Sequence, residues 1–119
     1  MKPRHARQGT LAEVGERGQA MVGGSTATVL GSGASAAVEA RYLAGAGVGT
    51  LVVATDSIAR EARDLDSSVA VRVDRSLAPP PPPPPWAEGM HPAAREVAVG
   101  AYRALLLLRR TLTGADPAS

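Results

Sequence analysis

The stretch from Thr28 to Ala37 constrains the fold of this chain more than any other. A short apolar run is followed there by glycines and then by small residues that can start a helix. Glycine at 31 and 33 lets the backbone turn tightly and approach a phosphate, and Ala36 keeps the helix near the strand. Amide groups at the start of such a helix favour an anion. The stretch therefore predicts a strand, a glycine turn and a helix that together suit a phosphate.

The next apolar run bears on whether this turn binds a nucleotide or is a plain chain reversal, which the same pattern also fits. Residues 50–54 form that run, and Asp56 follows it, roughly twenty residues beyond the glycines. A carboxylate in that place can accept hydrogen bonds from both ribose hydroxyls. The order is that of a βαβ unit that binds a mononucleotide. It leaves the identity of the ligand open.

The helices and strands around this unit are predicted from the spacing of apolar residues and from glycines that mark where an element ends. We expect a helix over residues 35–44 with Glu39 and Arg41 facing water, and a third strand over residues 69–73. Residues 58–64 fit either a short exposed helix or a loop. With right-handed crossovers, the strands predict an α/β fold with a small Rossmann-like parallel sheet and flanking helices.

A run of seven prolines, Pro79–Pro85, interrupts this pattern. Such a run adopts polyproline II and extends by about 3.1 Å per residue, or roughly 20 Å in all. We interpret it as a spacer. The alternative is a ligand for an aromatic groove, but no flanking basic residue has the usual offset. Trp86 is expected to pack on the domain.

The closing helix is expected over residues 93–112, after a turn and a short helix within residues 11–22 at the other end of the chain. Its apolar stripe comprises Val97, Ala101, Leu105, Leu108 and Leu112. This stripe either belongs to the core or partly contacts another subunit. The expected segments are an N-terminal arm with a short helix (1–24), a nucleotide-binding unit (25–78), a proline-rich linker (79–92), a closing helix (93–114) and a tail (115–119).

Composition limits the other functions that such a chain can have. The 119 residues suggest one domain, whose core must be built from Val, Leu and Ala because there is no Phe. The net charge is +2, and the arginines are too scattered for a nucleic-acid surface. Without cysteine there is no disulfide, thiol nucleophile or thiolate metal site. The two histidines are too far apart to suggest a metal site.

Two further features predict a soluble, cytoplasmic protein. The first five residues carry charges with no apolar core behind them, so we do not expect a secretory signal. The longest leucine run, residues 105–108, is far shorter than a membrane span.

Four motifs in the first half of the chain carry a resemblance to the ThiF/MoeB/HesA family, the bacterial relatives of ubiquitin-activating enzymes. Arg4-His-Ala-Arg-Gln8 is similar to the family's Arg-Tyr-x-Arg-Gln opening, and Glu13-Val-Gly-Glu-Arg-Gly-Gln19 to its Gly-x-x-Gly-Gln turn. Val29-Leu-Gly-Ser-Gly-Ala-Ser-Ala36 stands where the family has its nucleotide loop. Tyr42-Leu-Ala-Gly-Ala-Gly-Val-Gly-Thr-Leu51 is close to the family's Tyr-Leu-Ala-x-Ala-Gly-Val-Gly segment. Val99-Gly-Ala-Tyr-Arg-Ala-Leu105 more weakly resembles its late helix.

The resemblance implies an activity and roles for particular residues. Members adenylate the C-terminal Gly-Gly of a small ubiquitin-like carrier with ATP and magnesium, usually as dimers. By resemblance, Gly31 and Gly33 would approach the phosphates, with Ala36 behind them, and Asp56 would hold the ribose. Arg7 would reach the ATP of a neighbouring subunit, where a planar, permanently charged group stabilises a polyphosphate.

The chain also departs from the family pattern. Asp64-Leu-Asp-Ser67 stands where the family has Asn-Leu-x-Arg, so a phosphate-binding arginine is lost, and Asp66 is expected to repel a triphosphate. The following lysine helix, the magnesium-binding aspartate, the cysteine and the zinc thiolates are missing.

We therefore interpret the chain as a truncated activating-enzyme fold that binds ATP weakly, is catalytically impaired alone and acts with a partner. That partner is a second copy or a complete family member, and a ubiquitin-like sulfur carrier or a peptide is the substrate. An active small adenylyltransferase, an NAD-type βαβ module and a decayed fragment without activity are the alternatives.

Overall fold

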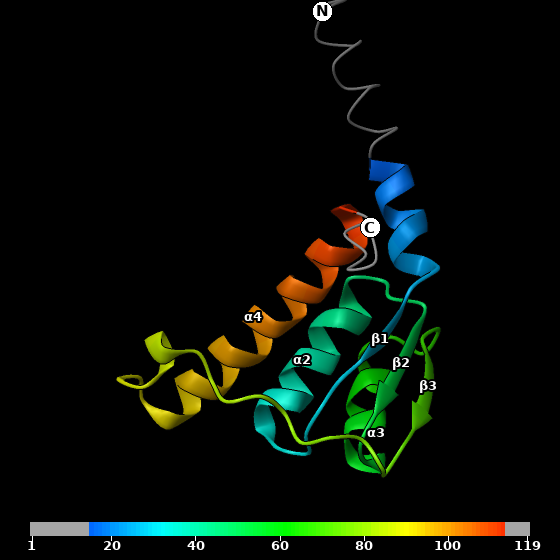
Figure 1. Ribbon diagram of the computed structural model, residues 1–119. Coiled ribbons are helices and arrows are strands. Elements are labelled where there is room, and N and C mark those ends of the chain that lie inside the picture. The colour runs from blue at the N-terminus through cyan, green and yellow to red at the C-terminus, as the bar shows by residue number, and fades with distance from the viewer. Residues whose placement is uncertain (1–14, 114–119) are drawn as a thin grey trace, which may run out of the picture.

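A computed structural model of the chain describes residues 15–113. Its first element is a helical segment over residues 15–23, which overlaps the short helix expected within residues 11–22. The other elements follow in the order β1 (Thr26–Thr28), α2 (Ala34–Gly45), β2 (Thr50–Val53), α3 (Asp56–Leu65), β3 (Ala70–Val73), the 3₁₀ helix η1 (Pro85–Ala87) and α4 (Pro92–Thr113) (Figure 1).

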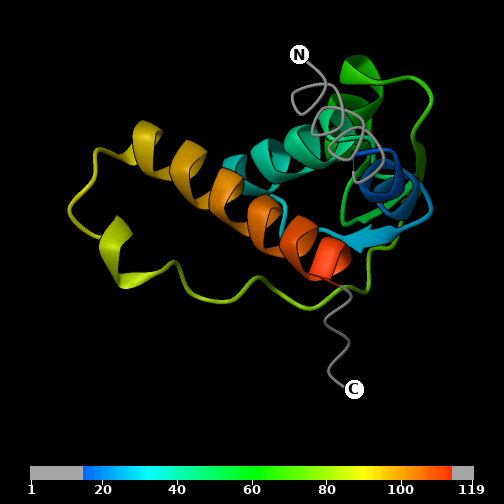
Figure 2. The same cartoon turned by 90° about the horizontal axis from the view of Figure 1, so that it is seen from above.

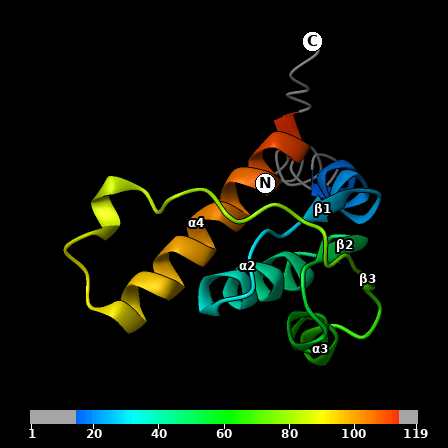
Figure 3. The same ribbon diagram turned by 60° about the horizontal axis from the view of Figure 1, so that its bottom comes forward.

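The three strands form one parallel sheet with the order β1-β2-β3. Thr28 lies beside Val52 in the sheet, and Val52 beside Arg72. Each strand is joined to the next through a helix, and Figure 3 shows both α2 and α3 on one face of the sheet. Right-handed crossovers produce this arrangement when strands are added in one direction. The prediction of an α/β fold with a small parallel sheet is confirmed.

The hydrophobic core lies between this face of the sheet and the helices. Leu51 and Val53 of β2 belong to it, with Leu43 of α2 and Ile58 of α3, and each is less than 2% exposed. Val52 lies outside this core and is buried at 4% exposure. The core thus consists of aliphatic side chains, as a chain without Phe requires.

Helix α3 settles the choice between a helix and a loop after the second strand. The Thr55 hydroxyl accepts a hydrogen bond from the Ile58 amide at 3.2 Å, which caps the start of the helix. Ile58, Ala59 and Ala62 are buried, while Arg60 and the other polar residues face water. The helix is therefore amphipathic and contributes one side to the core.

Helix α4 has a different buried side from the one that the sequence predicts. Its fully buried residues are Val99, Gly100 and Ala104. Val97 and Leu105 of the predicted stripe are 50% and 62% exposed. The reason is that α4 packs along α2, and this contact uses small residues: a Cβ atom on Gly100 would lie only 2.5 Å from the Ser35 carbonyl oxygen. Leu112 is also exposed, at 48%, whereas Leu108 packs against the core. The core alternative therefore accounts for only part of the stripe, and Val97, Leu105 and Leu112 lie outside the core.

The proline segment (residues 79–85) lies against the domain between β3 and α4. Figure 2 shows it running alongside α4. The Arg103 guanidinium donates a hydrogen bond to the Pro81 carbonyl oxygen at 2.7 Å, and Pro80 lies next to Gly31. Pro84 has φ −59° and ψ 149°, which is polyproline II geometry. The segment is thus an extended connection that two contacts hold to the domain.

Trp86 follows the proline segment and contacts α4. Its ring meets the ring of Tyr102 edge to face, with centroids 5.4 Å apart and an angle of 84° between the planes. Trp86 remains 49% exposed. The expected packing of Trp86 on the domain is therefore limited to one side of the ring.

Candidate functional site

The glycine turn after β1 is the first part of the candidate site. Gly31 has φ +94°, a backbone conformation that side chains other than glycine rarely tolerate. A Cβ atom at this position would also lie 3.0 Å from Pro80 Cγ. Gly33 is different, because it has φ −86° and open space around its missing side chain. Gly31 is thus required by the turn, whereas Gly33 leaves room for a ligand or for a larger residue.

The start of α2 already binds an oxyanion of the chain itself. The Ser35 amide, in the first turn, donates a hydrogen bond to Glu96 Oε2 at 2.9 Å. Gly33 precedes the helix and offers no side-chain cap, so the carboxylate from α4 supplies one. Ala36 is 1% exposed, which brings the helix close to the sheet as predicted. The amide favours an anion, and a nucleotide phosphate would have to compete with Glu96 for it.

Asp56 is the first residue of α3 and is separated from the end of β2 by two residues. Its Oδ2 accepts a hydrogen bond from Arg75 Nη2 at 2.7 Å. The two side chains are 66% and 70% exposed, so the pair is a surface ion pair and contributes little to stability. A ribose at Asp56 would compete with Arg75.

The predicted site residues share one edge of the sheet. Gly31 and Gly33 follow β1, and Asp56 follows β2; the carboxyl ends of parallel strands lie together. Asp66, by contrast, ends α3 at the opposite end of the helix, roughly 15 Å along its axis from Asp56. At that distance salt largely screens its charge, so the expected repulsion is not supported. Arg7 lies outside the described residues.

Glu39 is the residue that sequence reasoning misplaced. It was expected to face water, but it is only 4% exposed, on the side of α2 toward α4. Burial raises the pKa of its carboxyl to about 7, and the nearby charge of Arg103 opposes this increase. At neutral pH the group is therefore divided between its protonated and ionised forms. A side chain of this kind can donate or accept a proton, or change its hydrogen bonding with pH.

A cavity of about 200 Å³ adjoins Glu39. We call it the Glu39 cavity. Arg103 and Arg110 of α4 also line it, together with Thr28 at the end of β1 and Leu30 just after it. Pro80 and other apolar side chains complete its walls. It lies next to the glycine turn, because Leu30 directly precedes Gly31. Two cations and one buried carboxyl therefore face one small space.

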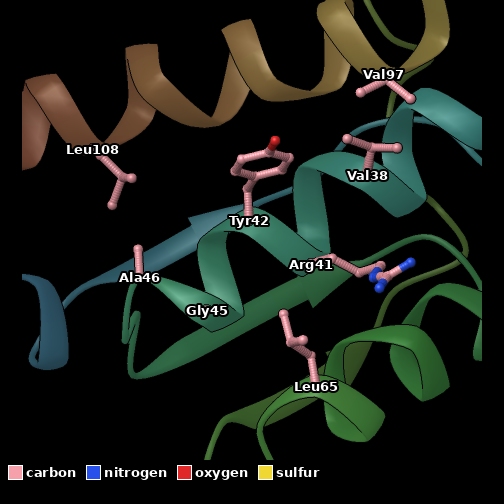
Figure 4. A pocket seen from close by; sticks show the side chains of 8 residues that line it. All are labelled: Val38, Arg41, Tyr42, Gly45, Ala46, Leu65, Val97 and Leu108. Atoms are coloured by element: carbon pink, nitrogen blue, oxygen red, sulfur yellow. The ribbon is translucent and has the colours of Figure 1, made fainter. Parts of the chain in front are cut away.

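A separate apolar groove runs along a neighbouring face of α2 and is bordered by residues of α3 and α4. The groove has a volume of about 540 Å³. Figure 4 shows the residues that line it: Val38, Arg41, Tyr42, Gly45, Ala46, Leu65, Val97 and Leu108. A second hollow of about 620 Å³ shares Ala46 and Leu108 with it and extends to the helical segment over residues 15–23. The groove holds no carboxyl or nucleophilic group. It suits apolar contacts better than chemistry.

Two negative findings concern the described part of the chain. Residues 15–113 contain no group of three or more His, Asp or Glu side chains that could hold a metal ion. No helix in the same range is long and apolar enough to cross a membrane.

Comparisons of the chain with protein-family models, with curated proteins and with solved structures gave no match. The resemblance to the ThiF/MoeB/HesA family thus stays a prediction from the four motifs.

Proposed function

We propose that this chain is a small Rossmann-like module of the ThiF/MoeB/HesA type that binds an adenine nucleotide weakly and acts as the partner subunit of an adenylyltransferase. One observation carries the proposal: β1, the turn at Gly31 and Gly33, α2, β2 and Asp56 follow one another in a parallel βαβ unit. This order brings amide groups and a carboxylate to one edge of the sheet, where a phosphate and a ribose can be held together.

The contacts already made at this edge explain why the binding should be weak. A phosphate must displace Glu96 from the Ser35 amide, and a ribose must displace Arg75 from Asp56. Each exchange replaces one favourable interaction by another, so the net gain is small.

The proposed role in a pair follows from the groups that adenylation needs. The reaction requires a polyphosphate held while charge moves to the leaving pyrophosphate, which relatives achieve with several cations and magnesium. Removal of one such donor typically lowers the rate about 10²- to 10³-fold. This chain lacks the arginine of the Asn-Leu-x-Arg segment, and Arg7 would serve the site of a neighbouring subunit. A complete relative would supply the rest.

Calorimetric titration with ATP and with NAD tests the nucleotide site. Gly33→Asp is the informative variant, because the open space at Gly33 admits the side chain while its charge repels a phosphate. Gly33→Ala is the matched control without charge. We expect ATP to bind more tightly than NAD and only Gly33→Asp to abolish the signal. Equal binding by both variants, or no binding by the native chain, would contradict the proposal.

The role in a pair has its own assay. Pyrophosphate exchange is measured with carriers that end in Gly-Gly, using the chain alone, a complete family member, and both together. We expect exchange above that of the relative only in the mixture, and a loss of this gain in Arg7→Ala. Strong exchange by the chain alone would show instead that it is an active adenylyltransferase.

A further inference from the structure

The Glu39 cavity holds charges that the βαβ unit does not explain. Arg103 and Arg110 come from α4 and face the same space. Among the ion pairs of residues 15–113, neither arginine takes part. Arg103 donates its hydrogen bond to a neutral carbonyl, that of Pro81. The cavity therefore carries two positive charges beside a carboxyl that is almost fully buried.

We propose that this cavity binds a phosphate monoester group, with Arg103 and Arg110 as its cationic partners and the carboxyl of Glu39 as a hydrogen-bond donor. Guanidinium groups suit this ligand because their planar donors pair with two oxygens at once. Two of them match a doubly charged anion better than a single carboxylate. A cavity of about 200 Å³ has room for the phosphate and part of the attached group.

The protonation of Glu39 decides whether the cavity accepts an anion. Arg103 on α4 is the charged group that acts on Glu39, and Arg110 lines the same cavity further along α4. Neither Thr28 and Leu30 nor the proline segment adds a titratable group. Burial raises the pKa of Glu39 to about 7. Below that pH the carboxyl can donate a hydrogen bond to a phosphate oxygen, and above it the carboxylate repels the anion. Affinity should fall about fivefold between pH 7 and pH 8 and about tenfold for each further pH unit.

The cavity also adjoins the proposed nucleotide site. Leu30 lines it and precedes Gly31, while Pro80 contacts the position of Gly31 and lines the cavity as well. A nucleotide held at the glycine turn is thus the nearest source of a phosphate monoester. The identity of the molecule rests on the proposed function, but binding of an oxyanion to the arginines does not.

Sulfate is the first probe, because its charge does not change between pH 6 and pH 8. Its affinity is measured by calorimetry on the native chain, Arg103→Gln, Arg110→Gln and Arg109→Gln. Arg109 is exposed, neighbours Arg110 on α4 and does not line the cavity, so it is the matched control. We expect Arg103→Gln to weaken binding about ten- to hundredfold and Arg110→Gln less, with Arg109→Gln unchanged. If Arg103→Gln fails to fold, the exposed Arg110 decides the question.

The pH profile supplies the second readout. Native protein should bind sulfate about fivefold less tightly at pH 8 than at pH 7, whereas Glu39→Gln should bind it without this dependence. Absence of sulfate binding, an equal loss in Arg109→Gln, or an unchanged pH profile in Glu39→Gln would each overturn the inference.

A third titration, with AMP, separates the inference from the proposed function. If Gly33→Asp loses AMP but keeps sulfate, both sites exist. If AMP does not bind while sulfate does, the proposed nucleotide function fails and the anion site stands with free phosphate as its ligand. If ATP binding depends on Gly33 but no variant of the arginines changes sulfate or AMP binding, only the inference fails.

Discussion

Helix α2 has a closed side and an open side, and α4 takes part in both. On the closed side, Gly100 brings α4 so near that Glu96 reaches the Ser35 amide, and Glu39 is buried. On the open side, large side chains such as Tyr42 and Leu108 line the apolar groove (Figure 4). The difference lies in residue size at the contact, since small residues let two helix backbones approach and large ones hold them apart.

This difference has a consequence for where chemistry can occur. The closed side removes water from a carboxyl and places cations around it, so it creates groups with altered properties. The groove exposes apolar surface without a reactive group, which is typical of contacts with another protein. Candidate site and candidate interface therefore lie on neighbouring faces of one helix, and Val38 lines the groove beside the tight contact with Gly100.

The largest effect is expected from Glu39→Gln at alkaline pH. Because the pKa of Glu39 is raised from 4.5 to about 7, the folded state holds a proton that the unfolded state releases between these values. Stability should therefore be full below pH 4.5 and fall as the pH rises through 7, by about 3 kcal/mol for this shift.

Denaturant unfolding from pH 4 to pH 8 checks this. Glu39→Gln should flatten the profile and exceed the native stability at pH 8. Glu88→Gln, a change at an exposed glutamate before α4, is the control and should leave the profile as it is. A native profile without the decline would contradict the burial of an ionisable carboxyl.

The next effect concerns the close contact between α2 and α4 at Gly100. In Gly100→Ala the new Cβ would lie 2.5 Å from the Ser35 carbonyl oxygen and 2.7 Å from Val38 Cβ, so α4 must move away. We expect a loss of about 1–3 kcal/mol, which exceeds the gain of roughly 1 kcal/mol that alanine gives a helix. Gly15→Ala is the control: Gly15 is also helical, with open space around it, and should show the opposite sign. Equal unfolding midpoints for the two variants would refute the tight contact.

The sequence predicted α2, β2 and β3 well because their signals are local. It left a helix and a loop open for residues 58–64, and β1 ends at Thr28, where the predicted apolar run begins. Glycines at the ends of elements and short apolar runs predicted the bounds of the helix at 34–45 and of the strands at 50–53 and 70–73 to within one or two residues. That Gly31 and Asp56 lie at the same edge of the sheet follows from the parallel pairing of β1 and β2. Neither inference needs a residue from far along the chain.

The errors concern contacts that α4 makes with segments distant in sequence. The leucines at 105–108 put apolar side chains on every side of the helix, so periodicity could not select the buried side. Gly100, a lone glycine inside a helical pattern, was the available signal for close packing. Glu39 was expected to face water because charged residues usually do, and the neighbouring charge of Arg103 lies about sixty positions away. The contact of Glu96 with the Ser35 amide spans a similar separation. No local pattern contains that information.

A smaller effect is expected at the exposed carboxylate of Asp56 than at the buried carboxyl of Glu39. Arg75→Ala removes the ion-pair partner of Asp56 and should lower stability by only about 0.2–1 kcal/mol, and less at high salt. The same change frees Asp56 for a ribose, so ATP affinity should increase. Thermal unfolding of the native chain and of Arg75→Ala measures the difference in stability. Calorimetric titration of the same two proteins with ATP then measures the difference in affinity. A decrease in ATP affinity would argue against Asp56 as the ribose ligand.

The smallest effect on stability and the clearest effect on assembly are expected in the groove. Val97 and Leu112 are 50% and 48% exposed and line the groove and the adjoining hollow, whereas Leu105 is 62% exposed and lines neither. Replacing any of them by Gln should change stability by no more than about 0.5 kcal/mol, because each is a surface position.

Self-association should respond to groove position, however, and not to exposure. Light scattering at micromolar concentration should show the native chain associating, with a clear decrease in Val97→Gln and Leu112→Gln and none in Leu105→Gln. If the native chain is strictly monomeric, the prediction that it self-associates through the groove is wrong. An equal decrease in all three variants would mean that α4 associates through its general apolar character, because Leu105 would then contribute as much as the residues of the groove.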